Sequence, residues 1–144
     1  MTLIDANLLL YAYHPQSDQH EASRAWLERV MSGAELVRFA WLTLWALLRI
    51  STNPPAFECP LTASEAEAAV AAWLAQPPAG ILKSGDRHWD ILRELMRKGQ
   101  TTGLLIMDAV LASIAIEHGA ILHTTDRDLS RFPGLKWTNP LASI

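Results

Sequence analysis

Residues 2–13 read Thr2-Leu3-Ile4-Asp5-Ala6-Asn7-Leu8-Leu9-Leu10-Tyr11-Ala12-Tyr13 and carry one carboxylate inside an otherwise apolar run. The pattern predicts a short buried strand over residues 2–4 and a helix from Asn7 that ends before Pro15. Asp5 then lies at the carboxyl end of the strand. An isolated ionised carboxylate in such a place costs on the order of several kcal/mol unless a partner or a metal compensates it. We therefore expect a functional role for Asp5, and an Asx turn with Asn7 is the structural alternative.

Segments of strand length and of helix length alternate along the rest of the chain. Strands are expected at residues 36–42, 80–83, 120–125 and 135–138. Helices are expected over residues 107–118, where Gly119 ends the helix, and after the N-capping side chains of Asp18, Thr43, Thr62 and Asp86. Residues 53–60 are expected to form a loop. This alternation predicts an α/β layered domain over residues 1–144, with a mainly parallel sheet covered by helices on both faces.

The composition is typical of a soluble globular protein. With 144 residues, of which 50% are hydrophobic, the chain is long enough for one hydrophobic core. A formal net charge of −3 argues against broad electrostatic capture of nucleic acid and leaves local basic patches for an RNA substrate. The single cysteine, Cys59, provides neither an internal disulfide nor a structural zinc site. No secretion signal and no apolar stretch of membrane-spanning length is visible, so we expect a cytoplasmic protein without membrane contact.

Three acids occupy corresponding places in the expected fold. Asp5 follows the first strand, Asp126 follows a late strand, and Asp108 lies in the first turn of an apolar helix. The crevice beyond the carboxyl ends of the strands is the usual ligand site of open α/β sheets. Converging carboxylates repel one another unless a cation lies among them, and hard oxygen ligands suit Mg²⁺ or Mn²⁺. The chemistry that this arrangement predicts is phosphoryl transfer to a metal-activated water.

Each acid also has a structural explanation. Asp108 could interact only with the dipole of its helix, and Thr-Asp-Arg-Asp at residues 125–128 is also typical of exposed turns. The combination of the three acids is what favours a metal site. A hydrolase of small phosphate esters with Asp5 as its nucleophile is disfavoured, because position 7 is Asn7 and a second aspartate is expected there.

Four motifs carry a resemblance to a known family. They are Asp5-Ala6-Asn7; Asp108-Ala109, which leads a small-residue helix ending in Glu117-His118-Gly119; Thr125-Asp126-Arg127-Asp128-Leu129; and Arg131-Phe132-Pro133-Gly134-Leu135, followed by Asn139-Pro140. In order and spacing they resemble the PIN-domain VapC toxins over nearly the whole chain. The resemblance implies a PIN-like three-layer α/β/α fold and a Mg²⁺-dependent endoribonuclease that is the toxin of a toxin–antitoxin pair. It also implies a VapB-type antitoxin, a homodimer, and tRNA or ribosomal RNA as the target.

The resemblance also assigns roles by position. It implies metal-binding catalytic acids at Asp5, Asp108 and Asp126. It further implies an additional metal ligand at Asp128 and, at Asn7, a residue that orients the first carboxylate.

Position 46 departs from the family pattern. Family members commonly carry a glutamate early in the helix after the second strand, where this chain has Ala46, and neither Glu35 nor Glu58 is placed to substitute. The missing carboxylate lowers the negative charge of the site and weakens its hold on metal. The alternative function is therefore a catalytically impaired PIN-like module that binds RNA or protein. A natural branch of the family, an inactivated toxin and a non-catalytic relative each account for Ala46.

Arg49 and the tryptophans have two interpretations each. Arg49 lies about one turn after Ala46, where it could contact a substrate phosphate or pair with an acid. Tryptophans at helical spacing are expected to be mostly core, and exposed ones to form a dimer or antitoxin groove, because aromatic residues are enriched at interfaces. The six tryptophans are at positions 26, 41, 45, 73, 89 and 137.

Overall fold

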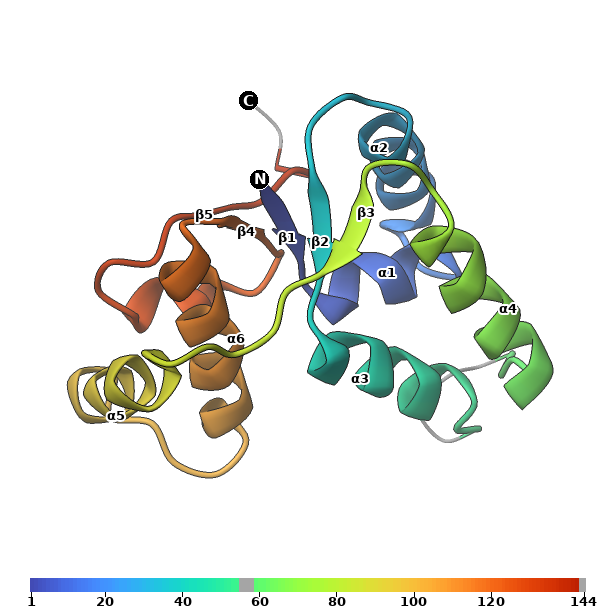
Figure 1. Cartoon of the computed structure of the whole chain (residues 1–144). Coiled ribbons are helices and arrows are strands. Elements are labelled where there is room, and N and C mark those ends of the chain that lie inside the picture. Colours follow the sequence, from blue (N-terminus) through green and yellow to red (C-terminus); the bar gives the residue numbers. More distant parts are fainter. Residues whose placement is uncertain (55–58, 143–144) are drawn as a thin grey trace.

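Strand β1 lies at the centre of a five-stranded sheet in the computed structural model, which describes residues 1–54 and 59–142 (Figure 1). The strand order is β3-β2-β1-β4-β5, and every neighbouring pair is parallel, which confirms the predicted parallel sheet. The strands are β1 (Thr2–Ile4), β2 (Val37–Phe39), β3 (Ala79–Ile81), β4 (Ile121–His123) and β5 (Trp137–Thr138).

Helices connect these strands and cover both faces of the sheet, as expected for an α/β/α layered fold. In the described part of the chain they are α1 (Ala6–Ala12), α2 (His20–Met31), α3 (Trp41–Ser51), α4 (Ala63–Leu74), α5 (His88–Lys98), α6 (Leu105–His118) and a 3₁₀ helix, η1 (Arg127–Arg131). None of the helices within the described residues is both long and apolar enough to cross a membrane.

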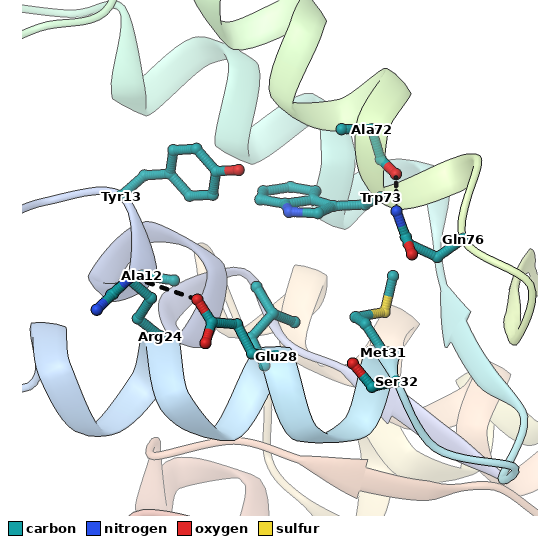
Figure 2. A pocket seen from close by; sticks show the side chains of 10 residues that line it. Ala12, Tyr13, Arg24, Glu28, Met31, Ser32, Ala72, Trp73 and Gln76 are labelled. Atoms are coloured by element: carbon teal, nitrogen blue, oxygen red, sulfur yellow. Dashed lines mark hydrogen bonds and ion pairs between the residues drawn. The ribbon is translucent and has the colours of Figure 1, made fainter.

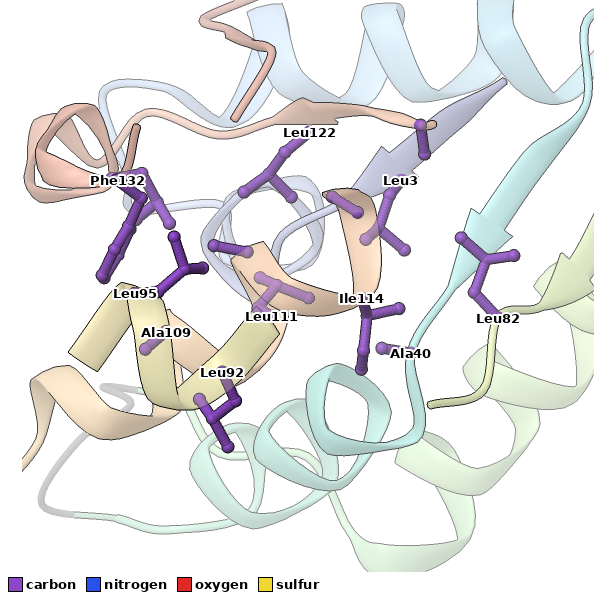
Figure 3. Packing of buried hydrophobic residues seen from close by; sticks show 14 residues of the cluster. Leu3, Ala40, Leu82, Leu92, Leu95, Ala109, Leu111, Ile114, Leu122 and Phe132 are labelled. Atoms are coloured by element: carbon purple, nitrogen blue, oxygen red, sulfur yellow. The ribbon is translucent and has the colours of Figure 1, made fainter. Parts of the chain in front are cut away.

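Neighbouring residues of β1 pack into two different cores. Leu3 is fully buried among side chains of α5, α6 and η1, including Leu95 and Phe132 (Figure 3). Ile4, also fully buried, packs with side chains of α1 to α4, including Trp73. Since successive side chains of a strand point to opposite faces, a two-sided apolar strand fixes the layered arrangement and leaves Asp5 at its end.

The predicted starts of α2 and α3 are wrong, and β2 is shorter than predicted. β2 ends at Phe39, not at residue 42, and α3 begins at Trp41 after the N-cap Ala40, so Thr43 lies inside the helix. The apolar run hides this boundary because it continues without a polar cap from strand into helix. α2 begins after the N-cap Gln19, and no side-chain capping bond is present at this helix start. The backbone N–H of Gln19 donates to Ser17 Oγ, so Asp18 is not the cap that was predicted.

The start of α5 is fixed by a distant residue. Asp86 is the predicted cap of this helix, but the N-cap is Arg87, and its side chain makes no capping hydrogen bond. Instead, the Glu117 carboxylate of α6 accepts the backbone N–H groups of Gly85 at 2.8 Å and Arg87 at 3.0 Å. These bonds lower the pKa of Glu117. A tertiary contact has therefore taken over the capping that a local side chain was expected to provide.

Other local predictions agree with the structure. The Thr62–Glu65 capping box is present in both directions, with N···O distances of 3.1 Å each. Gly119 ends α6 with a φ of 66°, a left-handed conformation that glycine adopts readily. β1 has the predicted bounds, whereas β3, β4 and β5 are shorter than expected. Within the predicted loop at residues 53–60, positions 55–58 lie outside the described residues.

Candidate metal-binding active site

The ends of β1 and β4 bring the amino-terminal and carboxyl-terminal acids together. β1 pairs with β4 so that Ile4 lies opposite His123, and the Asp5 amide donates to the His123 carbonyl at 3.0 Å. Asp5 is also the N-cap of α1, where its Oδ1 accepts the Ala6 N–H at 2.7 Å. This bond replaces the Asx turn with Asn7 that was the structural alternative.

Thr124 connects the two acids directly. Its buried hydroxyl donates to Asp5 Oδ2 at 2.7 Å and accepts the backbone N–H of Asp126 at 3.0 Å. The sequence analysis missed this residue. A threonine two positions before an acid, directly after a strand, is a pattern that side-chain to backbone turns use, and it was the available signal.

Asp108, Asp126 and Asp128 form the tightest group of acids. Each offers one carboxylate oxygen, and these oxygens lie within 4.8 Å of one another. Asp108 and Asp126 are half-buried and Asp128 is exposed. Asp126 is the N-cap of η1, and its Oδ1 accepts the Asp128 N–H at 2.9 Å. The short 3₁₀ helix thus holds two carboxylates beside the first turn of α6.

Asp5 lies next to this group without belonging to it. The sequence analysis expected Asp5, Asp108 and Asp126 as the principal ligands, with Asp128 as an additional one. In the structure Asp128 belongs to the group, whereas Asp5 does not. The Asp5 carboxylate acts on the group through its charge, which repels the carboxylates of Asp108 and Asp126. The four acids therefore share one electrostatic environment.

That environment raises two pKa values. Burial raises the pKa of Asp5, and its bonds with Thr124 and Ala6 oppose the effect. Burial also raises the pKa of Asp108 to about 6, with further contributions from Asp126, Asp5 and Asp128. Both shifts arise mainly from burial, and the neighbouring carboxylates add to them by repulsion.

The donor set fits a hard divalent cation. Three carboxylate oxygens within 4.8 Å of one another resemble the oxygen-only ligand sets that Mg²⁺ and Mn²⁺ prefer. Within the described residues, no histidine or cysteine joins this group, so softer metals find no matching ligands there.

Arg131 is a second residue that the sequence analysis missed. Its Nε donates to the Asp128 carbonyl at 3.2 Å and its Nη1 to the Gly99 carbonyl at 3.3 Å. Its Nη2 lies 3.9 Å from Asp128 Oδ1. The guanidinium also lowers the pKa of Asp108, against the larger raising effects. The i,i+3 spacing of Asp128 and Arg131 could have indicated that the two side chains are neighbours on a helix.

Other predicted residues lie on neighbouring elements. Asn7 is in the first turn of α1, but no hydrogen bond joins it to Asp5 among the described residues, and its Oδ1 is buried without a partner there. Thr43, in the first turn of α3, also has a buried, unpartnered hydroxyl. Ala46 is half-buried in the same helix, and Arg49 is exposed in its last turn.

Neither candidate substitute for the missing glutamate joins the site. Glu35 binds the amino terminus at 3.2 Å, next to the start of β1, whereas the acids gather at the other end of that strand. Glu58 lies outside the described residues.

The chain is also similar to known proteins. The PIN domain family pattern matches residues 2–135. The chain belongs to the PIN-domain family. Ribonuclease VapC37 of Mycobacterium tuberculosis is 41% identical to this PIN domain over 144 residues, which cover 100% of both chains. This similarity places the chain in the VapC group.

Solved structures share the PIN fold at low sequence identity. VapBC-1 of nontypeable Haemophilus influenzae has a TM-score of 0.69 at 16% identity, covering 98% of both chains. Mycobacterium tuberculosis VapC20, described as a sarcin–ricin loop-cleaving toxin, has a TM-score of 0.63 at 16% identity and covers 94% of this chain and 99% of its own. These structures support the three-layer PIN fold.

Two of the grooves among the described residues of the PIN domain carry aromatic side chains. The helical groove lies between α1, α2 and α4 and is lined by Leu27, Met31, Tyr13 and Trp73, with the Arg24–Glu28 pair on one wall (Figure 2). Tyr13 and Trp73 meet edge to face, with ring centroids 5.1 Å apart.

The aromatic groove lies between α3, α6 and the segment before α5. It is lined by Trp41, Trp45 and Met107, whose side chains are 41%, 63% and 50% exposed. Trp89 is also 63% exposed. The expectation that helical tryptophans are mostly core is therefore wrong, because Trp26 and Trp73 are buried while the others on helices face solvent.

Proposed function

We propose that this chain is a Mg²⁺-dependent endoribonuclease, the toxin of a VapBC-type pair that acts in the cytoplasm on tRNA or ribosomal RNA. The observation that carries the proposal is the carboxylate cluster at the end of the sheet in a PIN domain. The similarity to VapC37, a ribonuclease, and to VapC20, a sarcin–ricin loop-cleaving toxin, supports RNA as the substrate.

In the proposed mechanism Asp108, Asp126 and Asp128 hold the metal, with Asp5 beside them. A Mg²⁺ held there would supply a Lewis acid for a phosphate oxygen and would lower the pKa of a water that attacks the phosphodiester. Thr124 ties the Asp5 carboxylate to the backbone of Asp126 through one hydroxyl. Asp108, with a pKa of about 6, is ionised at neutral pH and available as a ligand.

An assay of RNA cleavage with and without Mg²⁺ tests the proposal, and substitutions at position 46 test the effect of the missing carboxylate. The unaltered chain should cleave RNA when Mg²⁺ is present, and cleavage should stop when a chelator removes the Mg²⁺. Ala46→Glu should raise cleavage at limiting Mg²⁺, by about tenfold if the new carboxylate contributes a little over 1 kcal/mol to metal binding. Ala46→Gln, similar in size but uncharged, is the matched control.

The alternative is a PIN module that binds RNA or protein without turnover. Ala46 is the observation that favours it, because the family pattern has a glutamate there. No cleavage by the unaltered chain, together with cleavage by Ala46→Glu, would support this alternative. Retained RNA binding without detectable Mn²⁺ binding in calorimetry would point the same way.

A homodimer is part of the proposed function, and we place its contact at the aromatic groove. Trp45→Glu should weaken dimerisation by about thirtyfold or more, equal to about 2 kcal/mol, because interface tryptophans contribute disproportionately to binding. Sedimentation equilibrium would measure the change. Trp89→Glu is the matched control, since Trp89 is equally exposed but does not line the groove. Equal effects of the two substitutions would reject this placement.

A VapB-type antitoxin is the proposed protein partner. The structural similarity to VapBC-1 supports a partner of this class. The helical groove (Figure 2) offers apolar side chains with an ion pair at its wall, which suits an apolar segment flanked by charges. Binding of such a segment would neutralise the toxin in the proposed pair.

A further inference from the structure

The carboxylate cluster has one cation fixed at its edge. Arg131, the last residue of η1, lies with Nη2 3.9 Å from Asp128 Oδ1, and its charge acts on Asp108. Its side chain is 33% exposed, so solvent and a ligand can reach it although protein groups also hold it. A cation in this place meets any anionic ligand that approaches the acids.

Two backbone carbonyls fix the guanidinium and leave most of its donors free. Nε bonds the Asp128 carbonyl, and Nη1 bonds the Gly99 carbonyl in the turn between α5 and α6. These contacts use two of the five N–H groups of an arginine, so three have no hydrogen-bond acceptor within the described residues. Nη2 is too far from Asp128 Oδ1 for a hydrogen bond, and its two N–H groups are among the three.

We propose that Arg131 is a phosphate-binding residue of this site, contacting a backbone phosphate of the RNA that the acid cluster receives. The inference rests on the proposed ribonuclease function. A planar guanidinium with free N–H groups matches a phosphate in geometry and charge. The two carbonyl bonds hold it in place beforehand, so little side-chain freedom is lost when phosphate binds. The acids alone would repel RNA, and the charge of Arg131 beside Asp128 offsets part of that repulsion.

RNA binding without cleavage tests the inference. Fluorescence anisotropy would follow a labelled single-stranded RNA in Ca²⁺ buffer, under conditions first checked to give no cleavage. Arg131→Gln should weaken binding by about tenfold or more and make the slope of log K against log salt shallower by about 0.7. Arg127→Gln is the matched control, because Arg127 is an exposed arginine of the same 3₁₀ helix. It should change the affinity by less than about twofold.

Two further measurements separate phosphate binding from a purely structural role. Arg131→Lys should keep the wild-type salt slope, because lysine retains the charge, but should recover only part of the affinity, because it cannot bond both carbonyls. Mn²⁺ binding without RNA should be unchanged or tighter in Arg131→Gln, since a positive charge beside the ligands is removed. Should Arg131→Gln fail to fold, the Lys variant alone decides: wild-type salt slope supports the inference, and a slope reduced as predicted for Gln contradicts it.

The measurements distinguish a failure of the proposed ribonuclease function from a failure of the Arg131 inference. A wild-type chain that binds RNA in Ca²⁺ but never cleaves it with Mg²⁺ contradicts the proposed function and leaves the Arg131 contact testable through binding. A chain that cleaves RNA while Arg131→Gln binds with wild-type affinity and slope overturns the inference alone. Mn²⁺ affinity that falls in parallel with RNA affinity also overturns it, because Arg131 would then only position Asp128.

Discussion

Asp5→Asn should reduce RNA cleavage by about a thousandfold or more, equal to about 4 kcal/mol of transition-state stabilisation, and leave the protein folded. Asp5 adds a negative charge beside the three clustered acids, and its removal weakens the hold on a divalent cation. Single-turnover cleavage at a Mg²⁺ concentration that does not saturate the unaltered protein would measure the loss.

The same substitution should hardly change stability. Because burial raises the pKa of Asp5, its ionised form is disfavoured in the folded state, and a neutral amide removes that cost. Asn can still accept one of the bonds that now come from Ala6 and Thr124 but loses the other. The two effects oppose each other, so the free energy of unfolding should change by no more than about 1 kcal/mol. Undiminished cleavage, or unfolding of Asp5→Asn, would contradict the proposed role.

Asp18→Asn is the matched control for this experiment. Asp18 is an exposed aspartate that makes no capping bond at the start of α2. Its substitution removes the same formal charge at a position that is far in sequence from Asp108, Asp126 and Asp128. It should leave both cleavage and stability at wild-type values.

Metal affinity should rise about tenfold per pH unit below about pH 6 and level off above about pH 7. Asp108 has a pKa of about 6, so below that pH metal must displace a proton from it. The raised pKa of Asp5 adds to the dependence in the same direction. Mn²⁺ titration followed by electron paramagnetic resonance would measure it. Asp108→Asn should bind more weakly and lose the step near pH 6, and a step that persists would contradict the assignment.

The stability of the metal-free protein should change with pH in the opposite direction. The pKa of Asp108 is raised from 3.8 to about 6 on folding, so the folded state binds more protons than the unfolded state between these values. The contribution of Asp108 to stability is therefore greatest at low pH and is lost as the pH rises from about 4 to about 6. Bound metal would reverse this trend by stabilising the ionised carboxylates.

Local pattern was sufficient to predict the sheet and the place of the acids. The two-sided apolar strand before Asp5 and the capping box at Thr62 depend on neighbours within a few residues, and both agree with the structure. Parallel strands end at the same edge, so acids after β1 and β4 could be brought together without knowing any distance. The site assignments themselves remain predictions for the experiments above.

Contacts between distant residues could not be predicted from the sequence. Thr124 is 119 residues from Asp5, and nothing local to either residue specifies their bond. Glu117 replaces Asp86 at the start of α5 for the same reason, since a tertiary acceptor was available. Arg131 and Asp128 are neighbours in a helix turn, but the carbonyl of Gly99 that fixes the guanidinium comes from another element.

The bond between Thr124 and Asp5 also sets when the proposed nuclease is assembled during synthesis. Asp5 is made first, and the hydroxyl that orients it is added 119 residues later. At about 5–20 residues per second, elongation separates the two by roughly ten seconds. Asp108, Asp126 and Asp128 belong to the same late part of the chain. A nascent chain that stalls before this part has the first acid but no carboxylate cluster, so the proposed active site is absent until Asp128 has been added.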